Sequence, residues 1–186
     1  MSITKYQVNI SKKYLLKISL PIFFSNLAIP FVGLIDTSLM GHLENAKFLA
    51  ATSIATAVIT LIFWTFGFLR MGTVGLVAQA HGKGDYREIV YTTIRSLCIA
   101  FFFSAIIVIL KNPILLGIKH FFFISPETFN LVEKYISIRL FSAPAELAIY
   151  VLIGFYLGLQ KTVISSLLVI LFSLLNIFLS IYFVIF

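Results

Sequence analysis

Residues 18–40 read ISLPIFFSNLAIPFVGLIDTSLM, an apolar stretch that carries the acid Asp36 near its end. About 20 residues of this kind suffice for a helix to cross ~30 Å of hydrocarbon. An ionised carboxylate at that depth costs roughly 2.5–3.5 kcal/mol on insertion scales. We therefore expect Asp36 to face a water-filled or helix-lined cavity, where it binds protons, ions or cationic ligands, as in a membrane transporter. The alternative is an acid at a helix end that reaches the outer interface.

The composition points to the same class of protein. The chain is 60% hydrophobic and 11% charged, whereas soluble domains are roughly 45–50% apolar and ~25% charged. The net charge of +7 would suit nucleic acid, but the basic residues fall in short segments between apolar runs, which is typical of membrane-protein loops. The hydropathy excludes a soluble nucleic-acid binder, so no nucleic-acid partner is expected. Cys98 is the single cysteine, so one chain offers neither a disulfide framework nor a thiolate metal site.

The hydrophobic runs predict an all-α integral membrane protein with about five transmembrane helices. Strict alternation of apolar and polar residues is absent, and this argues against a membrane barrel. Residues 1–17 are basic and polar, without a signal-peptide cleavage pattern, and are expected to form a cytoplasmic segment. The expected spans within 18–186 are 18–40, 48–69, 89–110, 135–159 and 163–186.

The loop charges predict the orientation in the membrane. Counting Lys and Arg on alternate sides of the spans gives nine against five, with the larger number on the side of the N-terminus. Basic residues accumulate on the cytoplasmic side. We therefore expect a multi-pass protein of the cell (inner or plasma) membrane with a cytoplasmic N-terminus.

Two connections carry recognisable turn signals. Residues 78–85 form a short inner loop, in which the glycines allow positive φ and Asp85 can cap a helix that begins near Tyr86. The outer segment 111–134 is longer. Within it, Ser125 followed by Pro126 reads as an N-cap and the first position of a helix that leads into span four.

Prolines and small residues mark the first span. Pro21 and Pro30 each remove a backbone donor and favour a kink. A bend at Pro30 could alter the hydration of Asp36, or serve packing alone. Asn26, Pro30, Gly33 and Thr37 also form one small or polar stripe, a pattern that helices use mainly to pack closely.

Further polar residues fall inside spans four and five. Arg139 and Ser142 are one turn apart, and Ser142 and Glu146 lie on one face. Glu146, seven residues from Arg139, is expected to pair with it only loosely. Glu146 either forms a structural ion pair, extends its carboxylate to the membrane interface, or binds a cation. Asn176 and Ser180 are four apart and can hydrogen-bond across helices, with or without a role in a substrate or coupling network.

The chain does not contain the residue patterns that several kinds of chemistry need. The chain has no phosphate-binding loop of the Gly-x-x-x-x-Gly-Lys type. His42, His81 and His120 make no pair at metal-ligand spacing, and no Ser or Cys nucleophile stands beside a histidine. Neither an enzyme nor a bound cofactor is expected.

Three stretches in order resemble the multidrug and toxic compound extrusion (MATE) transporters, particularly their DinF-like branch. The first combines Pro21 with 30–37 and 41–43, and is similar to that branch's first helix. The second, 70–85, is similar to its second helix and inner loop. The third, 139–145 followed by Gly154 and 158–160, is similar to its fourth helix.

The resemblance implies an antiporter driven by a proton or sodium gradient that exports bulky cationic or amphipathic compounds by alternating access. Asp36 matches the first-helix acid that the family uses in ion coupling. Asn176 matches the asparagine of a fifth-helix Asn-x-x-x-Asp pattern, so Asp36 and Asn176 are the candidates for holding sodium. The acid of that pattern is replaced by Ser180, which cannot exchange a proton at physiological pH.

The resemblance also implies twelve helices in two lobes, of which these five would form most of the N-terminal lobe. A two-lobe machine cannot operate on five helices. The remaining helices could come from a second polypeptide or from self-assembly, or the chain could be a non-transporting remnant or a membrane interaction subunit. A lipid-precursor flippase is disfavoured, because Arg139 is the one base expected well inside a span.

Overall fold

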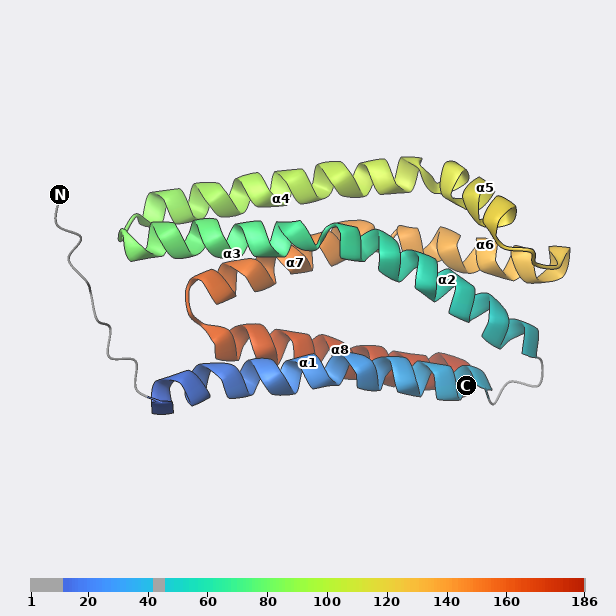
Figure 1. Cartoon of the computed structure of the whole chain (residues 1–186), viewed down its shortest axis with the longest axis horizontal. Helices are drawn as coiled ribbons and strands as arrows, with labels where there is room; N and C mark the ends of the chain where they lie inside the picture. Colours follow the sequence, from blue (N-terminus) through green and yellow to red (C-terminus); the bar gives the residue numbers. More distant parts are fainter. Residues whose placement is uncertain (1–11, 42–45, 186) are drawn as a thin grey trace.

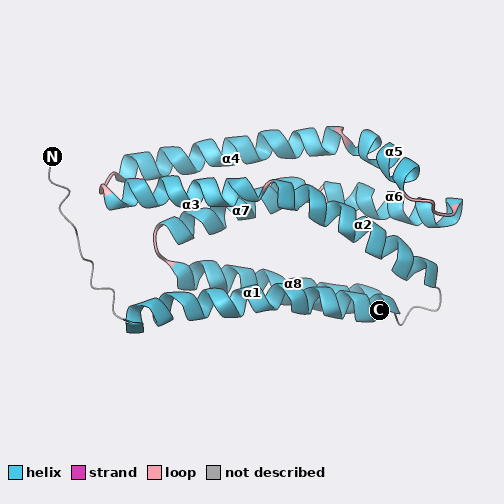
Figure 2. Cartoon of the chain, viewed as in Figure 1, coloured by secondary structure: helices cyan, strands magenta, loops and turns pink. Residues whose placement is uncertain are grey.

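The computed structural model describes residues 12–41 and 46–185, and within these ranges all regular structure is α-helical (Figures 1 and 2). The helices are α1 (Lys12–Gly41), α2 (Ala46–Thr65), α3 (Gly67–Gly82), α4 (Tyr86–Ile109), α5 (Lys111–Phe121), α6 (Pro126–Leu140), α7 (Ala143–Gly158) and α8 (Thr162–Ile185). Most of the expected segment 1–17 lies outside the described residues, and its last part, from Lys12, is helical.

The helices form two packed groups. α3, α4 and α7 pack against one another, and α2 packs along α6, whereas α1 makes its extended contact with α8 (Figure 1). The larger core lies among α2, α4, α6 and α7, with Ile136, Leu140 and Leu147 fully buried. Large apolar side chains also cover much of the outer surface, including Leu61, Trp64 and Phe102. An apolar exterior around an apolar core is expected of a helical protein in lipid.

The described helices agree with membrane spans in length and composition. α4, α8 and the α2–α3 segment Lys47–Gly82 are each long and apolar enough to cross a bilayer, and α6 with α7 forms a fourth, bent span. The first expected span lies within α1, whose apolar stretch is Ser19–Ile35. Both prolines of α1 lie inside a helix that continues through them.

Three boundaries differ from the sequence prediction. The second span was expected to end at 69, but after a single turn residue at Phe66 the helix continues to Gly82. The outer segment contains the helix α5, with Pro113 in its first turn, where no backbone donor is needed. The fourth span begins earlier, at Pro126, and is interrupted at residues 141–142 with a bend of 49° between α6 and α7.

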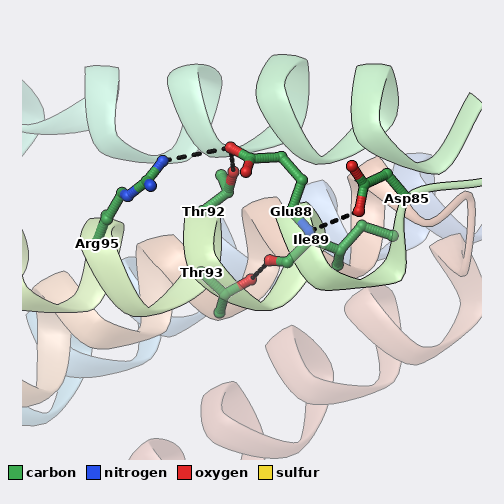
Figure 3. A network of polar contacts seen from close by, with 6 residues as sticks. All are labelled: Asp85, Glu88, Ile89, Thr92, Thr93 and Arg95. Atoms are coloured by element: carbon green, nitrogen blue, oxygen red, sulfur yellow. Dashed lines mark hydrogen bonds and ion pairs between the residues drawn. The ribbon is translucent and has the colours of Figure 1, made fainter. Parts of the chain in front are cut away.

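The expected helix caps are confirmed. The Asp85 carboxylate accepts a hydrogen bond from the Glu88 backbone N–H at 3.0 Å, and Gly84 before it has a φ of +71°. Glu88 in turn accepts hydrogen bonds from Thr92 and Arg95, which fixes the first turns of α4 (Figure 3). Ser125 caps α6 by accepting from the Thr128 backbone N–H. These contacts satisfy donors that a helix start leaves free.

Two glycines set the distance between α3 and α7. A Cβ on Gly154 would lie 2.8 Å from the Arg70 carbonyl oxygen and 2.9 Å from the Thr73 Cβ. A Cβ on Gly158 would lie 2.7 Å from the Val77 Cβ. The two backbones can therefore approach this closely only because both positions lack a side chain.

Candidate functional site

The first group of candidate residues lies on the α1–α8 pair. The Ser25 hydroxyl donates to the Ile22 carbonyl at 2.9 Å and lies 3.4 Å from the Ser166 hydroxyl of α8. Both serines are buried. The two helices start at the same end of the molecule and run side by side in the same direction (Figure 1).

This parallel arrangement relates Asp36 to the polar residues of α8. From Ser25 to position 36 α1 rises about 16 Å, and from Ser166 to position 176 α8 rises about 15 Å, at 1.5 Å per residue. The backbone of Asp36 is therefore level with that of Asn176, and Ser180 lies about one turn beyond. The side chains of Asp36 and Thr37 lie outside the described part of the chain. The Asn176 side chain is exposed and Ser180 is half-buried.

The described members of the small-residue stripe on α1 do not pack against α8. Asn26, Pro30 and Gly33 are exposed, and a Cβ on Gly33 would meet nothing within 4 Å. α1 meets α8 through the face that carries Ser25, so packing through the stripe stays a prediction. The exposed stripe leaves two polar or proline positions, Asn26 and Pro30, on a face that α8 does not cover.

The second group lies at the interruption between α6 and α7. The Arg139 Nη1 atom is 3.0 Å from the Glu146 Oε1 atom and donates to the Ser142 hydroxyl at 2.7 Å. Ser142 donates back to the Arg139 carbonyl at 2.7 Å. The Arg139 guanidinium also lies 6.0 Å from the ring centroid of Phe63 on α2, within range of a cation–π interaction. Pairing between Arg139 and Glu146 is thus direct.

The expectation of a loose pair is wrong because it assumed one continuous helix. On such a helix, residues seven apart are separated by about two turns, or ~10 Å of rise. Here the chain turns at Phe141 and Ser142, so Arg139 in the last turn of α6 and Glu146 in the first turn of α7 point at each other. The charges therefore neutralise each other at the bend.

Two further polar groups near this bend were not predicted as site residues. Arg70 was assigned to the end of a span, but it lies inside the Lys47–Gly82 segment. Tyr150 is on α7, one turn after Glu146. The apolar run that continues from 71 to 80 was the signal that Arg70 lies inside a longer helix and not at its end.

Among the described side chains, no hydrogen bond or ion pair joins the two groups. Among the described residues, no three His, Cys, Asp or Glu side chains gather as a metal site. What the geometry offers is a pair of helices with polar positions at one level, and a separate charged cluster between two interrupted spans.

Comparison with known proteins assigns this architecture to a family. The MatE family profile matches residues 21–182. The chain belongs to the MatE family. Members of this family are secondary transporters that use ion gradients, not enzymes.

The MatE chain resembles several curated proteins over part of their length. It is 34% identical to DNA damage-inducible protein F of Escherichia coli over 94% of this chain and 38% of that protein. It is 23% identical to the multidrug export protein MepA of Staphylococcus haemolyticus, over 82% of this chain and 34% of that protein. It is 28% identical to the multidrug resistance protein NorM of Aliivibrio fischeri, over 85% of this chain and 34% of that protein. The chain thus spans little more than a third of these relatives.

A solved structure shares the fold. A transporter of the MOP superfamily from Pyrococcus furiosus, described as having a binding pocket of reversed polarity, superposes with a TM-score of 0.81. The match covers 91% of this chain and 37% of that one, at 22% identity. The helical membrane fold expected from the sequence is therefore confirmed.

Proposed function

We propose that this chain is the N-terminal part of a multidrug efflux antiporter that exports bulky cationic or amphipathic compounds. Membership of the MatE family supports this, as do relatives named for multidrug export and multidrug resistance. The bilayer and a small-molecule substrate are then its partners. Alternating access would need the rest of a family-length bundle, on the same polypeptide or another one. The protein would lie in the cell (inner or plasma) membrane with a cytoplasmic N-terminus.

Asp36 is the proposed ion-coupling residue. The observation that carries this assignment is the parallel packing of α1 and α8, which sets Asp36 level with Asn176. A carboxylate and an amide oxygen at one level suit a proton or a sodium ion, because both ions prefer oxygen donors. Ser180, about one turn beyond, would add a hydroxyl but no second exchangeable charge. Asn26, Pro30 and Thr37 are the α1 residues proposed to line the substrate path.

The test is ethidium efflux from a bacterial host that lacks its own exporters. The chain is expressed alone and together with the coding sequence that follows it, with membrane insertion confirmed for each. Efflux that collapses when the ion gradient is removed supports the proposal. If both forms are inserted but neither exports ethidium or other cationic dyes, the proposal is overturned in favour of a non-transporting remnant or a membrane interaction subunit.

A further inference from the structure

Large apolar side chains stay exposed beyond the end of the α4 span. The 24 residues of α4 rise about 36 Å, which is enough to cross ~30 Å of hydrocarbon. After the single residue Leu110 the chain turns into α5 (Figure 1), so α5 begins where the span ends. Yet Leu116 and Phe121 are 69% and 78% exposed, and Phe123 is fully exposed. These side chains contact little of the described chain, so something else must shield them from water.

α5 has one face in the protein core and another that the described chain leaves open. Leu115 and Ile118 are buried in the larger core and hold α5 against the bundle. The open face carries Leu116 together with the exposed base Lys119. The sequence from 111 to 126 contains no acid. A short helix that presents both basic and apolar side chains is typical of a membrane surface, where lipid phosphates lie just above the acyl chains.

The backbone after α5 limits how deep this segment can lie. The Phe122 N–H donates to the Ile118 carbonyl at 2.9 Å, and residues 122–125 are then not helical. Non-helical backbone exposed to the hydrocarbon core does not occur in membrane proteins, whereas exposed phenylalanines are unfavourable in water. The boundary between headgroups and acyl chains meets both conditions. The ion pair between Lys47 and Glu127, whose side chains are both exposed, follows directly after this connection and suits its polar side.

The surrounding surface favours lipid over another protein as the cover of α5. The exposed apolar surface of α4, which includes Phe102 and Ile109, leads up to α5. Both helices lie along the edge of the molecule opposite α1 and α8 (Figure 1). The exposed amides that call for a protein partner in a membrane, Asn26 and Asn176, are on α1 and α8. Further helices that met those amides would leave α5 open to the bilayer.

We propose that α5 and residues 121–123 anchor the chain in the headgroup–acyl boundary of the membrane leaflet at which α4 ends. The exposed leucine and phenylalanines insert among the upper acyl carbons, and Lys119 reaches the lipid phosphates. The anchor holds the connection between α4 and α6 at the membrane surface. It does not depend on the role proposed for Asp36, because a chain that exports nothing would keep it.

The test measures the depth of a tryptophan by fluorescence quenching of the whole chain in nanodiscs. Trp64 is the single tryptophan, so Phe123→Trp in a Trp64→Phe background gives one reporter. The discs contain phosphatidylcholine brominated either near the headgroup or near the chain end. The shallow bromine should quench this reporter about twofold more than the deep one, because an interfacial segment is buried only ~5–10 Å. Iodide in the buffer should quench it weakly.

Two references calibrate the depth. Native Trp64, exposed near the middle of the Lys47–Gly82 segment, should be quenched more by the deep bromine. Lys83→Trp in the Trp64→Phe background, in the exposed turn after α3, should be quenched mainly by iodide. Leu116→Trp should repeat the shallow pattern, and it carries the test if Phe123→Trp does not fold. Strong iodide quenching of the α5 reporters, a preference for the deep bromine, or quenching by neither agent, which would mean cover by protein, overturns the proposal.

Discussion

At the scale of single residues, the ion pair between Arg139 and Glu146 stabilises the bend between α6 and α7. Its side chains are 38% and 27% exposed, so the pair is neither fully buried nor free in solvent. Removing one partner of a buried pair costs about 3–5 kcal/mol, and an exposed pair contributes at most about 1 kcal/mol. An intermediate value is expected here, because the partner left behind is partly hydrated.

Arg139→Gln should lower the free energy of unfolding by about 1–2 kcal/mol. The measurement is an SDS titration of the purified chain, followed by circular dichroism. Arg139→Gln combined with Glu146→Gln should recover part of the loss, because no unpaired charge remains. Arg95→Gln breaks the exposed pair with Glu88 and should change stability by less than about 1 kcal/mol. A loss no larger than that of Arg95→Gln would contradict a structural role for the Arg139 pair.

Asp36→Asn should abolish ion-coupled dye efflux while leaving the chain inserted in the membrane. Asparagine keeps the size of the side chain but cannot exchange a proton and binds sodium more weakly than a carboxylate does. The readout is ethidium efflux under an imposed proton or sodium gradient. Glu133→Gln, a half-buried acid on α6, is the matched control and should transport normally. Wild-type efflux in Asp36→Asn would rule out the coupling assignment.

At the scale of helices, the two glycines of α7 limit what the α3–α7 contact accepts. Gly158→Ala places a Cβ 2.7 Å from the Val77 Cβ and 3.0 Å from the Val74 carbonyl oxygen. The backbones must then separate, at a cost of about 1–3 kcal/mol. Gly75→Ala makes the same change on α3 where nothing lies within 4 Å. It should be neutral or stabilising by up to about 1 kcal/mol, because alanine favours a helix.

The same SDS titration compares the two variants. Gly158→Ala is expected to lower stability more than Gly75→Ala, because only a Cβ at position 158 meets atoms within 4 Å. A stabilised Gly158→Ala would mean that α3 and α7 are farther apart than the structure places them.

The elements also show what the sequence could and could not predict. Caps depend on a few adjacent residues, so Asp85 and Ser125 were predicted correctly. The interruption at residues 141–142 was missed, because the sequence does not show whether Pro144 lies in the first turn of a new helix or inside a kinked helix. The Arg139–Glu146 contact followed from that interruption and was missed with it. The face of α1 that meets α8 was not predicted, because local sequence does not encode which neighbour a helix meets.

At the scale of the whole molecule, the proposed coupling site depends on α1 and α8 running in parallel. The apolar runs predict that both helices span the membrane, but not that these two are neighbours. Their hydrogen-bonded serines provide a direct check. Ser25→Cys with Ser166→Cys, in a Cys98→Ser background, should form a disulfide, because the hydroxyl oxygens that the sulfur atoms replace are 3.4 Å apart and small side-chain rotations can bring the sulfurs to the S–S bond length of about 2 Å.

Cross-linking in isolated membranes, read after proteolytic cleavage in the α4–α5 region, tests this arrangement. Ser25→Cys with Ser180→Cys is the matched control, because position 180 lies about 21 Å along α8 from position 166. A bridge from 25 to 166 and none from 25 to 180 confirms that the two helices pair at this level, as the common level of Asp36 and Asn176 requires. A bridge to 180 would mean that α1 and α8 pair in another register. Asp36 would then not be level with Asn176, and coupling through Asn176 could not operate.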